Sequence, residues 1–377
     1  MSMETPPARP TLLKRYSRAI HSFYARHERA LGLSFFLGGI VWDALTLRTI
    51  DNPIDNLILI GYLVGLTTVI ILDIRARSGR FKLKRIDEPQ ALLRGAIQFL
   101  LGALLSAYVI FYSRSITWST HLAFWLILVI GMVANEFLTR KLSSFPAQIA
   151  LLFFASVTMM AWLLPVALAE MSLGVFRLAI GLSLLLGLVV YLVGRKAGRV
   201  ISYRIGHAEL WVLASMALLL DVGYRANWIP PVPLSVQEGG IYNSVIKENG
   251  TYRLEWTSLK RSWLSPDYAR TVIREEGEPV YCFTAVFAPT RLEETIYHVW
   301  KRKDVATGKW IESDRIGYRM TGGRKDGYRG STFKRNLTPG QWRVVVVTED
   351  GKVLTRIPFD IPEETDDGDR WRRTLVR

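Results

Sequence analysis

Charged residues inside long apolar stretches of the sequence are candidates for a functional site, and among them we select Asp43, Arg177 and Asp221. A charge in the hydrocarbon core of a bilayer costs at least about 2.5–3.5 kcal/mol, so such residues are usually paired or functional. An Asp43–Arg177 or Asp221–Arg177 pair would neutralise both partners, and the cluster would then line a polar pocket in the outer leaflet. Structural ion pairs, or side chains that extend to the interface, are the favoured interpretation.

A second group mixes aromatic and basic side chains in the C-terminal part of the chain. Trp310, Tyr318 and Tyr328 lie among cations that include Arg324 and Arg329. Aromatic rings and guanidinium groups together are suited to sugar rings that carry acidic groups, as in an envelope glycan. An ordinary solvated strand face is the alternative that this composition favours.

Three further residues have positions typical of a β-domain core. His298 and Trp300 are two residues apart, so they share one face of a strand. Trp342 begins a run of valines that is typical of a central strand. We expect the two tryptophans to fill the core.

The sequence lacks the motifs of metal, nucleotide and nucleophile sites. No HExxH, GxSxG, P-loop or GxGxxG pattern is present, and no two histidines have metal-ligand spacing. Cys282 is the only cysteine, which excludes an intramolecular disulfide and a cysteine-based metal cluster. We therefore predict no metal, no cofactor and no catalytic residue, and an enzyme is the less favoured class.

These residues must be positioned by a helical membrane region. Seven apolar runs of roughly 16 to 24 residues are each long enough to cross about 30 Å of hydrocarbon. The sequence therefore predicts seven transmembrane helices, in the runs Leu31–Leu47, Leu57–Leu72, Ala91–Phe111, His121–Phe137, Pro146–Ala169, Gly174–Val193 and Ile205–Trp228.

The chain then changes to a period of two. After Pro230, Pro231 and Pro233, which forbid a helix, short alternating strands follow, with Asp350-Gly351 as a two-residue hairpin turn. The predicted fold is an α-helical membrane bundle followed by a small all-β antiparallel sandwich of the Ig-like class. The predicted segments are a cytoplasmic basic segment at 1–30, the bundle at 31–229, a proline-led connector at 230–278, the sandwich at 279–361 and a charged tail at 362–377.

The distribution of cations predicts the orientation. The net charge is +15, and most cations of the first half lie in alternate connections between apolar runs. The positive-inside rule then places the N-terminus in the cytoplasm, and an odd number of crossings places the sandwich in the periplasm. Orientation in the membrane explains these cations, so nucleic acid is not an expected partner. The cations are Arg75, Arg77, Arg80, Lys82, Lys84 and Arg85 in the second connection, Arg140 and Lys141 in the fourth, and Arg195, Lys196, Arg199 and Arg204 in the sixth.

The segment from Pro279 to Ile361 resembles a bacterial domain of unknown function found at the C-terminus of envelope membrane proteins. The family usually has a tryptophan where this chain has Tyr328. The multi-helix region looks like the uncharacterised membrane family that accompanies that domain. The resemblance implies a fold and an envelope location, and it brings no activity. The matching residues are Pro279-Val280, His298-Val299-Trp300, Gly327-Tyr328-Arg329-Gly330-Ser331 and Gly340-Gln341-Trp342-Arg343-Val344.

Two classes of function follow. The favoured one is an inner-membrane protein that presents a periplasmic sandwich to an envelope glycan, a lipid headgroup or a partner protein. The alternative is a transporter or membrane-embedded enzyme that acts on a lipid-linked substrate through Asp43, Arg177 and Asp221. The sequence predicts neither the ligand nor the oligomeric state.

Overall fold

The computed structural model describes two compact units, Met1–Arg48 and Thr49–Arg377. Of the first unit it describes residue 38 and residues 40–47, which include a helix at 40–46. Of the second it describes residues 50–77, 89–117, 121–137, 144–198, 207–258, 268–275, 277–363 and 371–377.

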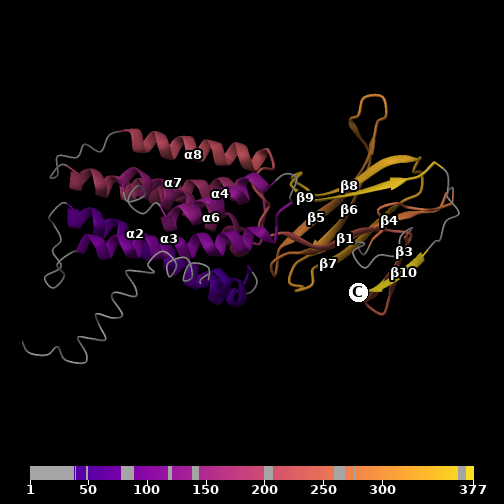
Figure 1. The fold of residues 1–377 in the computed structure, drawn as a ribbon, viewed down its shortest axis with the longest axis horizontal. Helices are drawn as coiled ribbons and strands as arrows, with labels where there is room; N and C mark the ends of the chain where they lie inside the picture. Colours follow the sequence, from indigo (N-terminus) through magenta and orange to yellow (C-terminus); the bar gives the residue numbers. More distant parts are fainter. Residues whose placement is uncertain are drawn as a thin grey trace, which may run out of the picture. The chain divides into compact units, whose positions relative to one another are not determined.

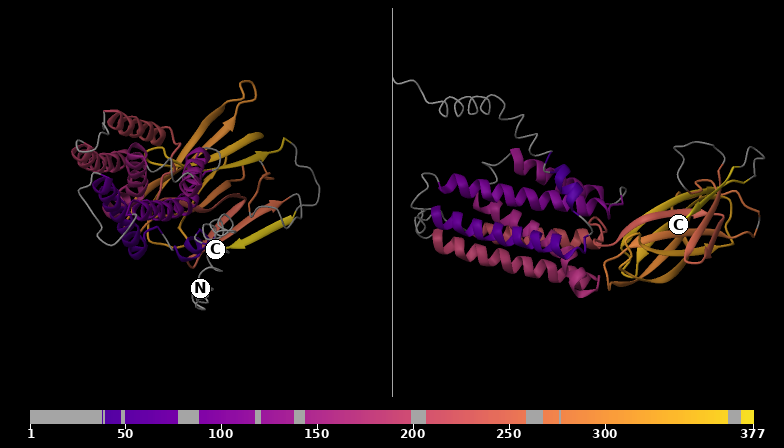
Figure 2. Two further views of the ribbon diagram at one scale, coloured as in Figure 1. Left: turned by 60° about the vertical axis from the view of Figure 1, so that its left-hand side comes forward. Right: turned by 90° about the horizontal axis from the view of Figure 1, so that it is seen from below.

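The N-terminal half of this unit is a bundle of helices. Helix α2 packs on α3, α6 packs on α7, and α4 and α8 pack on α3 and α7 respectively (Figures 1 and 2). The helices are α2 (Pro53–Arg77), α3 (Pro89–Ser113), α4 (Leu122–Phe137), α6 (Phe145–Leu168), α7 (Leu173–Gly198) and α8 (Ala208–Arg225).

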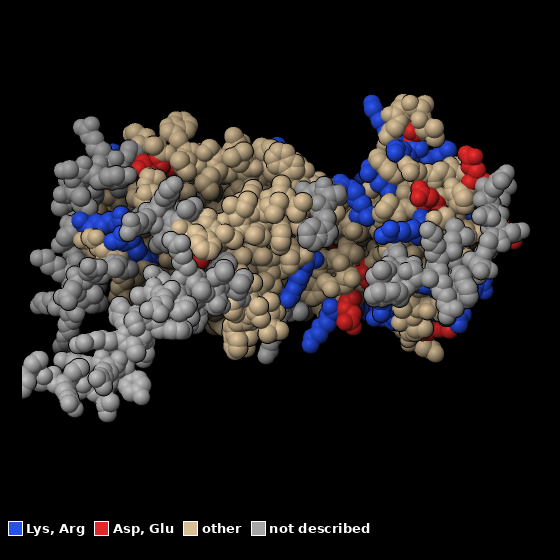
Figure 3. All heavy atoms as spheres, in the orientation of Figure 1, with Lys and Arg blue, Asp and Glu red and all other residues tan. Residues whose placement is uncertain are grey.

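Four of the described helices are long and apolar enough to cross a membrane. They are Pro53–Arg77, Leu92–Ser113, Phe145–Leu168 and Leu173–Ala197. Helix α4 is apolar but has only 16 residues, fewer than the roughly 20 that a crossing needs. On the face shown in Figure 3, the visible surface of the bundle between its two ends carries few charged side chains.

The prediction of seven transmembrane helices is therefore wrong. In the last predicted run, α8 covers 18 residues and includes three charged ones, Glu209, Asp221 and Arg225. In the first predicted run, only the short helix at 40–46 is described, and residues 31–37 lie outside the described residues. An apolar run in the sequence thus overstated the length of apolar helix that forms.

Aromatic side chains hold the bundle interior together. The Trp162 ring of α6 meets Tyr108 and Phe111 of α3 edge to face, at centroid distances of 5.2 and 5.5 Å. The Tyr108 hydroxyl donates to the Ala155 carbonyl at 2.9 Å, and the Tyr112 hydroxyl donates to the Thr158 carbonyl at 3.0 Å. These hydrogen bonds satisfy the polar atoms that a dry helix interface would otherwise leave unpaired.

The C-terminal region is β-rich, with antiparallel pairing between its strands. Its sheets have the strand orders β1-β4-β7, β10-β3-β2 and β6-β5-β8-β9 (Figure 1). The strands are β1 (Ser235–Tyr242), β2 (Ser244–Glu248), β3 (Thr251–Ser258), β4 (Val280–Phe287), β5 (Glu293–Lys303), β6 (Trp310–Thr321), β7 (Tyr328–Lys334), β8 (Gly340–Thr348), β9 (Val353–Ile361) and β10 (Trp371–Val376).

The strands extend beyond the segment predicted as the sandwich. Strands β1, β2 and β3 lie in the predicted connector, and β10 lies in the predicted tail. A turn that contains Asp350-Gly351 joins β8 to β9 as expected, but it is longer than the two residues predicted, since β8 ends at Thr348 and β9 begins at Val353. Of the pair only Gly351 has a positive φ, of 74°. Alternating core residues of all three sheets pack together, among them Phe283 and Trp300.

The outer edge of β9 is covered by other parts of the unit. The Thr117 hydroxyl, in the connection between α3 and α4, donates to the Leu354 carbonyl at 2.6 Å. The Asn227 side chain, just after α8, accepts from the Val353 N–H at 3.2 Å. Further along, Val272 N–H donates to the Asp360 carbonyl at 2.9 Å. An uncovered edge strand would be free to pair with another chain, so these bonds both fix and protect the sheet.

A buried lysine joins the same hairpin to the end of α8. The Lys352 ammonium group donates to the Tyr224 carbonyl at 2.6 Å and lies 3.9 Å from the centroid of the Tyr224 ring. Only 5% of Lys352 is exposed. The Tyr224 ring in turn stacks on Phe176 of α7 at 4.0 Å. The last carbonyls of a helix lack partners within the helix and carry partial negative charge, so a cation is a favourable cap.

We expect the substitution Lys352→Met to lower the free energy of unfolding of the full chain by about 2–3 kcal/mol. The variant removes the charged donor of the Tyr224 carbonyl, which then keeps only the longer bond from the Asn227 N–H at 3.3 Å. Thermal unfolding of the detergent-solubilised protein measures the loss. Lys309→Met, at an exposed position, is the matched control and should change stability little. Equal stability of the two variants would contradict the role of the cap.

Candidate binding surface

The four-stranded sheet has one face in the core and one face outside it. We call the outer face of β6, β5 and β8 the basic face. On it Val299, Val345 and Val347 form a small apolar cluster with the partly buried Tyr297. Around this cluster the strand register places other side chains of the face, among them Lys301, Trp310, Glu312, Arg315, Arg319 and Arg343.

Two arginines of the basic face stack on aromatic rings. The Arg315 guanidinium lies 4.4 Å from the centroid of the Tyr297 ring, and the Arg343 guanidinium lies 4.2 Å from that of Trp310. Gly317 makes the first stack possible, since a Cβ at that position would lie 2.7 Å from the Tyr297 ring. Stacking holds each guanidinium flat, with its edge N–H groups directed outward to an anion.

The cations of the basic face are only partly neutralised. Glu312 lies 3.5 Å from Lys301, whereas no described carboxylate lies within ion-pair distance of Arg315, Arg319 or Arg343. Partial burial, followed by the nearby Arg356 charge, lowers the pKa of Arg343 from its ordinary value. Its Nε atom is buried and has no hydrogen-bond partner among the described residues. A bound anion would offset the cost of the partly buried charge.

The five predicted ligand residues do not form one group. Trp310 lies on the basic face. Tyr318 belongs to the inner face, where its hydroxyl bonds to Thr284 Oγ1 at 2.7 Å. The Tyr318 ring stacks on Tyr328 at a centroid distance of 6.2 Å, and the Arg324 guanidinium lies 5.4 Å from the centroid of the Tyr328 ring.

Arg329, the fifth predicted ligand residue, lies in β7. Its backbone carbonyl accepts from the Tyr252 hydroxyl at 3.3 Å. The structure therefore separates Trp310 from the other four, and the partners of Trp310 are residues that the sequence analysis had not selected.

The three predicted core residues lie inside the β region. His298 is buried between the sheets, with Nε2 2.9 Å from Thr284 Oγ1 and Nδ1 2.8 Å from Thr332 Oγ1. Burial lowers the pKa of His298 to about 3, so the ring is neutral. Trp300 packs edge to face on Phe359.

Trp342 also packs on Phe359, in a stacked arrangement. Its ring lies at a centroid distance of 6.4 Å from Phe359, and its indole N–H donates to the Thr338 carbonyl at 2.8 Å. Trp300 and Trp342 are 0% and 3% exposed. Both tryptophans therefore have the packing role of core residues rather than the exposure that a ligand contact requires.

Two of the three residues predicted as an intramembrane cluster, Arg177 and Asp221, form an ion pair at the protein surface. The Arg177 Nε atom lies 2.9 Å from Asp221 Oδ1, and Arg225 lies 3.0 Å from Asp221 Oδ2. More than half of the Arg177 side chain is exposed. Asp43 belongs to the unit Met1–Arg48, which is described by itself. The Arg177–Asp221 pair predicted from sequence thus forms, with a second arginine on the same carboxylate.

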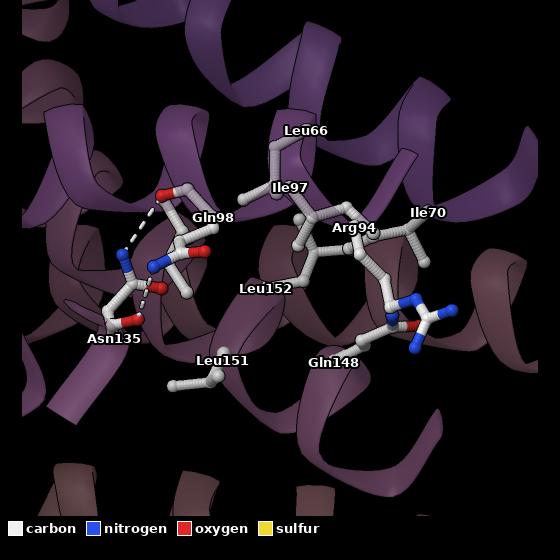
Figure 4. Close-up of a pocket in the computed structure, with 10 residues that line it drawn as sticks. Leu66, Ile70, Arg94, Ile97, Gln98, Asn135, Gln148, Leu151 and Leu152 are labelled. Carbon is white, nitrogen blue, oxygen red and sulfur yellow. Dashed lines mark hydrogen bonds between the residues drawn. The ribbon is translucent and has the colours of Figure 1, made fainter. Parts of the chain in front are cut away.

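A polar pocket inside the bundle was not selected from the sequence. Gln98 of α3 and Asn135 of α4 bond reciprocally to each other's backbone carbonyls at 3.1 and 2.9 Å, beside Arg94 and Gln148 (Figure 4). Gln148 also donates to the buried Asp73 carboxylate at 3.1 Å. The pocket volume is about 20 Å³, which is room for water and not for a substrate.

These polar residues join helices through the low-dielectric interior. Gln98, Asn135 and Gln148 are each the one amide side chain of an apolar run, and that isolation is the sequence signal that would have found them.

Comparison with known proteins adds one family and no activity. Residues 293–361 match the model of a family described as "Protein of unknown function (DUF2914)". No curated protein matches. Among solved structures, the Pseudomonas fluorescens alkylpurine DNA glycosylase AlkC bound to DNA containing an abasic site analog matches at 11% identity. That match covers 84% of this chain and 100% of the other, and its TM-score of 0.21 is too low to support any argument about fold or function.

The buried histidine gives a pH-dependent prediction. Below pH 6.5 the unfolded chain binds a proton on His298, whereas the folded chain does not until about pH 3. Stability is therefore present at neutral pH and is lost as the pH falls through this range, by roughly 1–2 kcal/mol between pH 7 and pH 5. His298→Gln, which cannot titrate, should show a shallower loss in chemical denaturation across this range. Identical pH slopes for the two proteins would contradict the assignment.

Proposed function

We propose that this chain is a multi-pass membrane protein whose β-rich region binds an acidic glycan of the cell envelope on the basic face. The observation that carries the proposal is the pair of stacks Arg315–Tyr297 and Arg343–Trp310, which hold two cations beside two aromatic rings. No described carboxylate pairs with either guanidinium. Aromatic faces with adjacent guanidinium groups suit sugar rings that bear carboxylate or phosphate groups.

The rigidity of the surface supports binding. The stacked arginines lie on β6 and β8, and both strands pair with β5 over most of their length. A guanidinium that is already held in place loses less conformational freedom when it binds than a free one does. The small apolar cluster of Val299, Val345 and Val347 is buried, and the Tyr297 ring packs against it, which helps to hold this ring in place.

We place the β-rich region outside the cytoplasm. Helices α2 and α7 end in basic residues, Arg75 and Arg77 in one and Arg195 and Lys196 in the other. The β region instead contacts the other helix ends, where α3 and α8 finish. The last turn of α8, at the β region, has a single basic residue, Arg225, and its charge is paired with Asp221. The more basic ends remain on the cytoplasmic side, so the opposite end, with the β region, faces outward.

A transport or enzymatic role through the intramembrane charges has less support. Asp221 is already neutralised by Arg177 and also by Arg225. The polar pocket of Figure 4 has room only for water. We therefore do not carry that alternative further.

Binding is tested with the detergent-solubilised full chain and two polysaccharides, polygalacturonate and neutral dextran. We expect Arg315→Ala/Arg343→Ala to weaken polygalacturonate binding at least about tenfold, because two charge-assisted contacts of about 1 kcal/mol each are lost. Arg335→Ala is the matched control, since Arg335 also stacks on an aromatic ring, Phe333, but away from the basic face. Equal binding by the double variant and the control, or equal binding of dextran, would reject the proposal.

The orientation is tested with reporters fused after Arg377. Alkaline phosphatase at this position should be active in cells, because it folds only outside the cytoplasm, and a fluorescent protein that matures only in the cytosol should stay dark. The same pair fused after Arg77, at the basic end of α2, is the control and should give the opposite result. Cytosolic fluorescence from the C-terminal fusion would overturn the placement of the β-rich region.

A further inference from the structure

Two adjoining pockets lie where the β region meets the bundle. The larger has a volume of about 250 Å³ and is lined by Phe111 at the end of α3, by Phe287 at the end of β4, and by Arg114 and Lys325. The smaller has a volume of about 180 Å³ and shares Arg114 with the first. Ser115 and Gln237 also line both pockets. The pockets therefore adjoin, and together they have polar and apolar walls.

The polar wall carries two cations from distant parts of the sequence. Arg114 directly follows α3, and Lys325 lies in the loop between β6 and β7. No described carboxylate forms an ion pair with Lys325. The carboxylate in the smaller pocket belongs to Glu238, and Arg377 Nε binds its two oxygens at 2.9 and 2.8 Å. The space thus favours an anion.

The apolar wall lies at the end of a predicted crossing. Phe111 is in the last turn of α3, whose segment Leu92–Ser113 is apolar enough to span a bilayer. Ile50, which precedes α2, and Phe287 are also buried there. A group held beside Arg114 is therefore at the level where this helix would leave the hydrocarbon for the headgroup region.

We propose that this junction pocket binds the phosphate headgroup of an anionic membrane lipid. Arg114 and Lys325 would pair with the phosphate, the Ser115 hydroxyl and the Gln237 amide would supply hydrogen bonds, and Phe111 would contact the first carbons of the chains. A volume of about 250 Å³ suits a headgroup and is below the roughly 300–1,000 Å³ of sites for larger ligands.

The lipid would also connect the two parts of the unit. Its binding residues come from the end of α3, the start of β1 and the loop before β7. A ligand that contacts both the bundle and the β region stabilises the arrangement in which they meet, because it binds the folded unit and not the unfolded chain. This site is separate from the basic face, so the proposal does not depend on glycan binding.

The test uses the full chain in detergent, with added phosphatidylglycerol or phosphatidylcholine, and native mass spectrometry to count retained lipid. We expect selective retention of phosphatidylglycerol, and an at least tenfold loss in Arg114→Gln/Lys325→Gln. Lys309→Gln/Arg335→Gln removes the same charge at exposed positions that line neither pocket and should retain the lipid. Lys325→Arg keeps the charge and should also retain it. Thermal unfolding of each variant without lipid shows that it is folded.

Three results would overturn the proposal. Retention of phosphatidylglycerol by the folded Arg114→Gln/Lys325→Gln variant would show that the lipid binds elsewhere. Equal loss in the control variant would show that net charge alone decides retention. Displacement of the lipid by inorganic phosphate at equal concentration would show that the site selects a free anion and not a lipid. Because the basic face is intact in the pocket variant, polygalacturonate binding by that variant tells the two proposals apart.

Discussion

The ends of helices and the edges of sheets leave backbone groups without partners, and in this chain the two kinds of end satisfy each other. Lys352 of the β8–β9 turn caps the Tyr224 carbonyl of α8, and Asn227 beyond α8 accepts from the backbone of β9. Thr117 covers a third position on the same edge. Buried backbone groups must be paired, so these contacts largely determine where the bundle and the β region meet.

The two faces of the four-stranded sheet differ in their environment, since one is buried and the other carries charged side chains. The inner face is sealed against β4 and β7, and even its polar side chain, His298, is neutral and bonded to two threonines. The outer face keeps arginines that only solvent or a ligand can neutralise, held by the rings of Tyr297 and Trp310. Strand alternation produces this contrast, since successive side chains point to opposite faces.

Local sequence patterns predicted turns and strands. They did not predict which face of a strand a side chain occupies where pairing with a distant strand changes the alternation. The hairpin turn at Asp350-Gly351 and the antiparallel strands followed from turn chemistry and alternation. Trp310 and Tyr318 are eight residues apart, so simple alternation places them on one face, yet they lie on opposite faces. The register against β5 shifts between Trp300 and Lys301, and the extra residue on β6, Ser313, reverses the alternation. Only the pairing of two strands reveals such a bulge.

The cap on α8 limits how freely the two parts of this chain can be exchanged in evolution or in protein engineering. A chimaera that places the β8–β9 turn on an unrelated bundle would bury the Lys352 ammonium without the Tyr224 carbonyl and ring. It would also leave the Val353 N–H without the Asn227 side-chain oxygen that now accepts its hydrogen bond. Tyr224 and Asn227 therefore have to stay with the β region in any chimaera. The segment that can be exchanged as a unit begins inside α8 and not at the prolines that follow it.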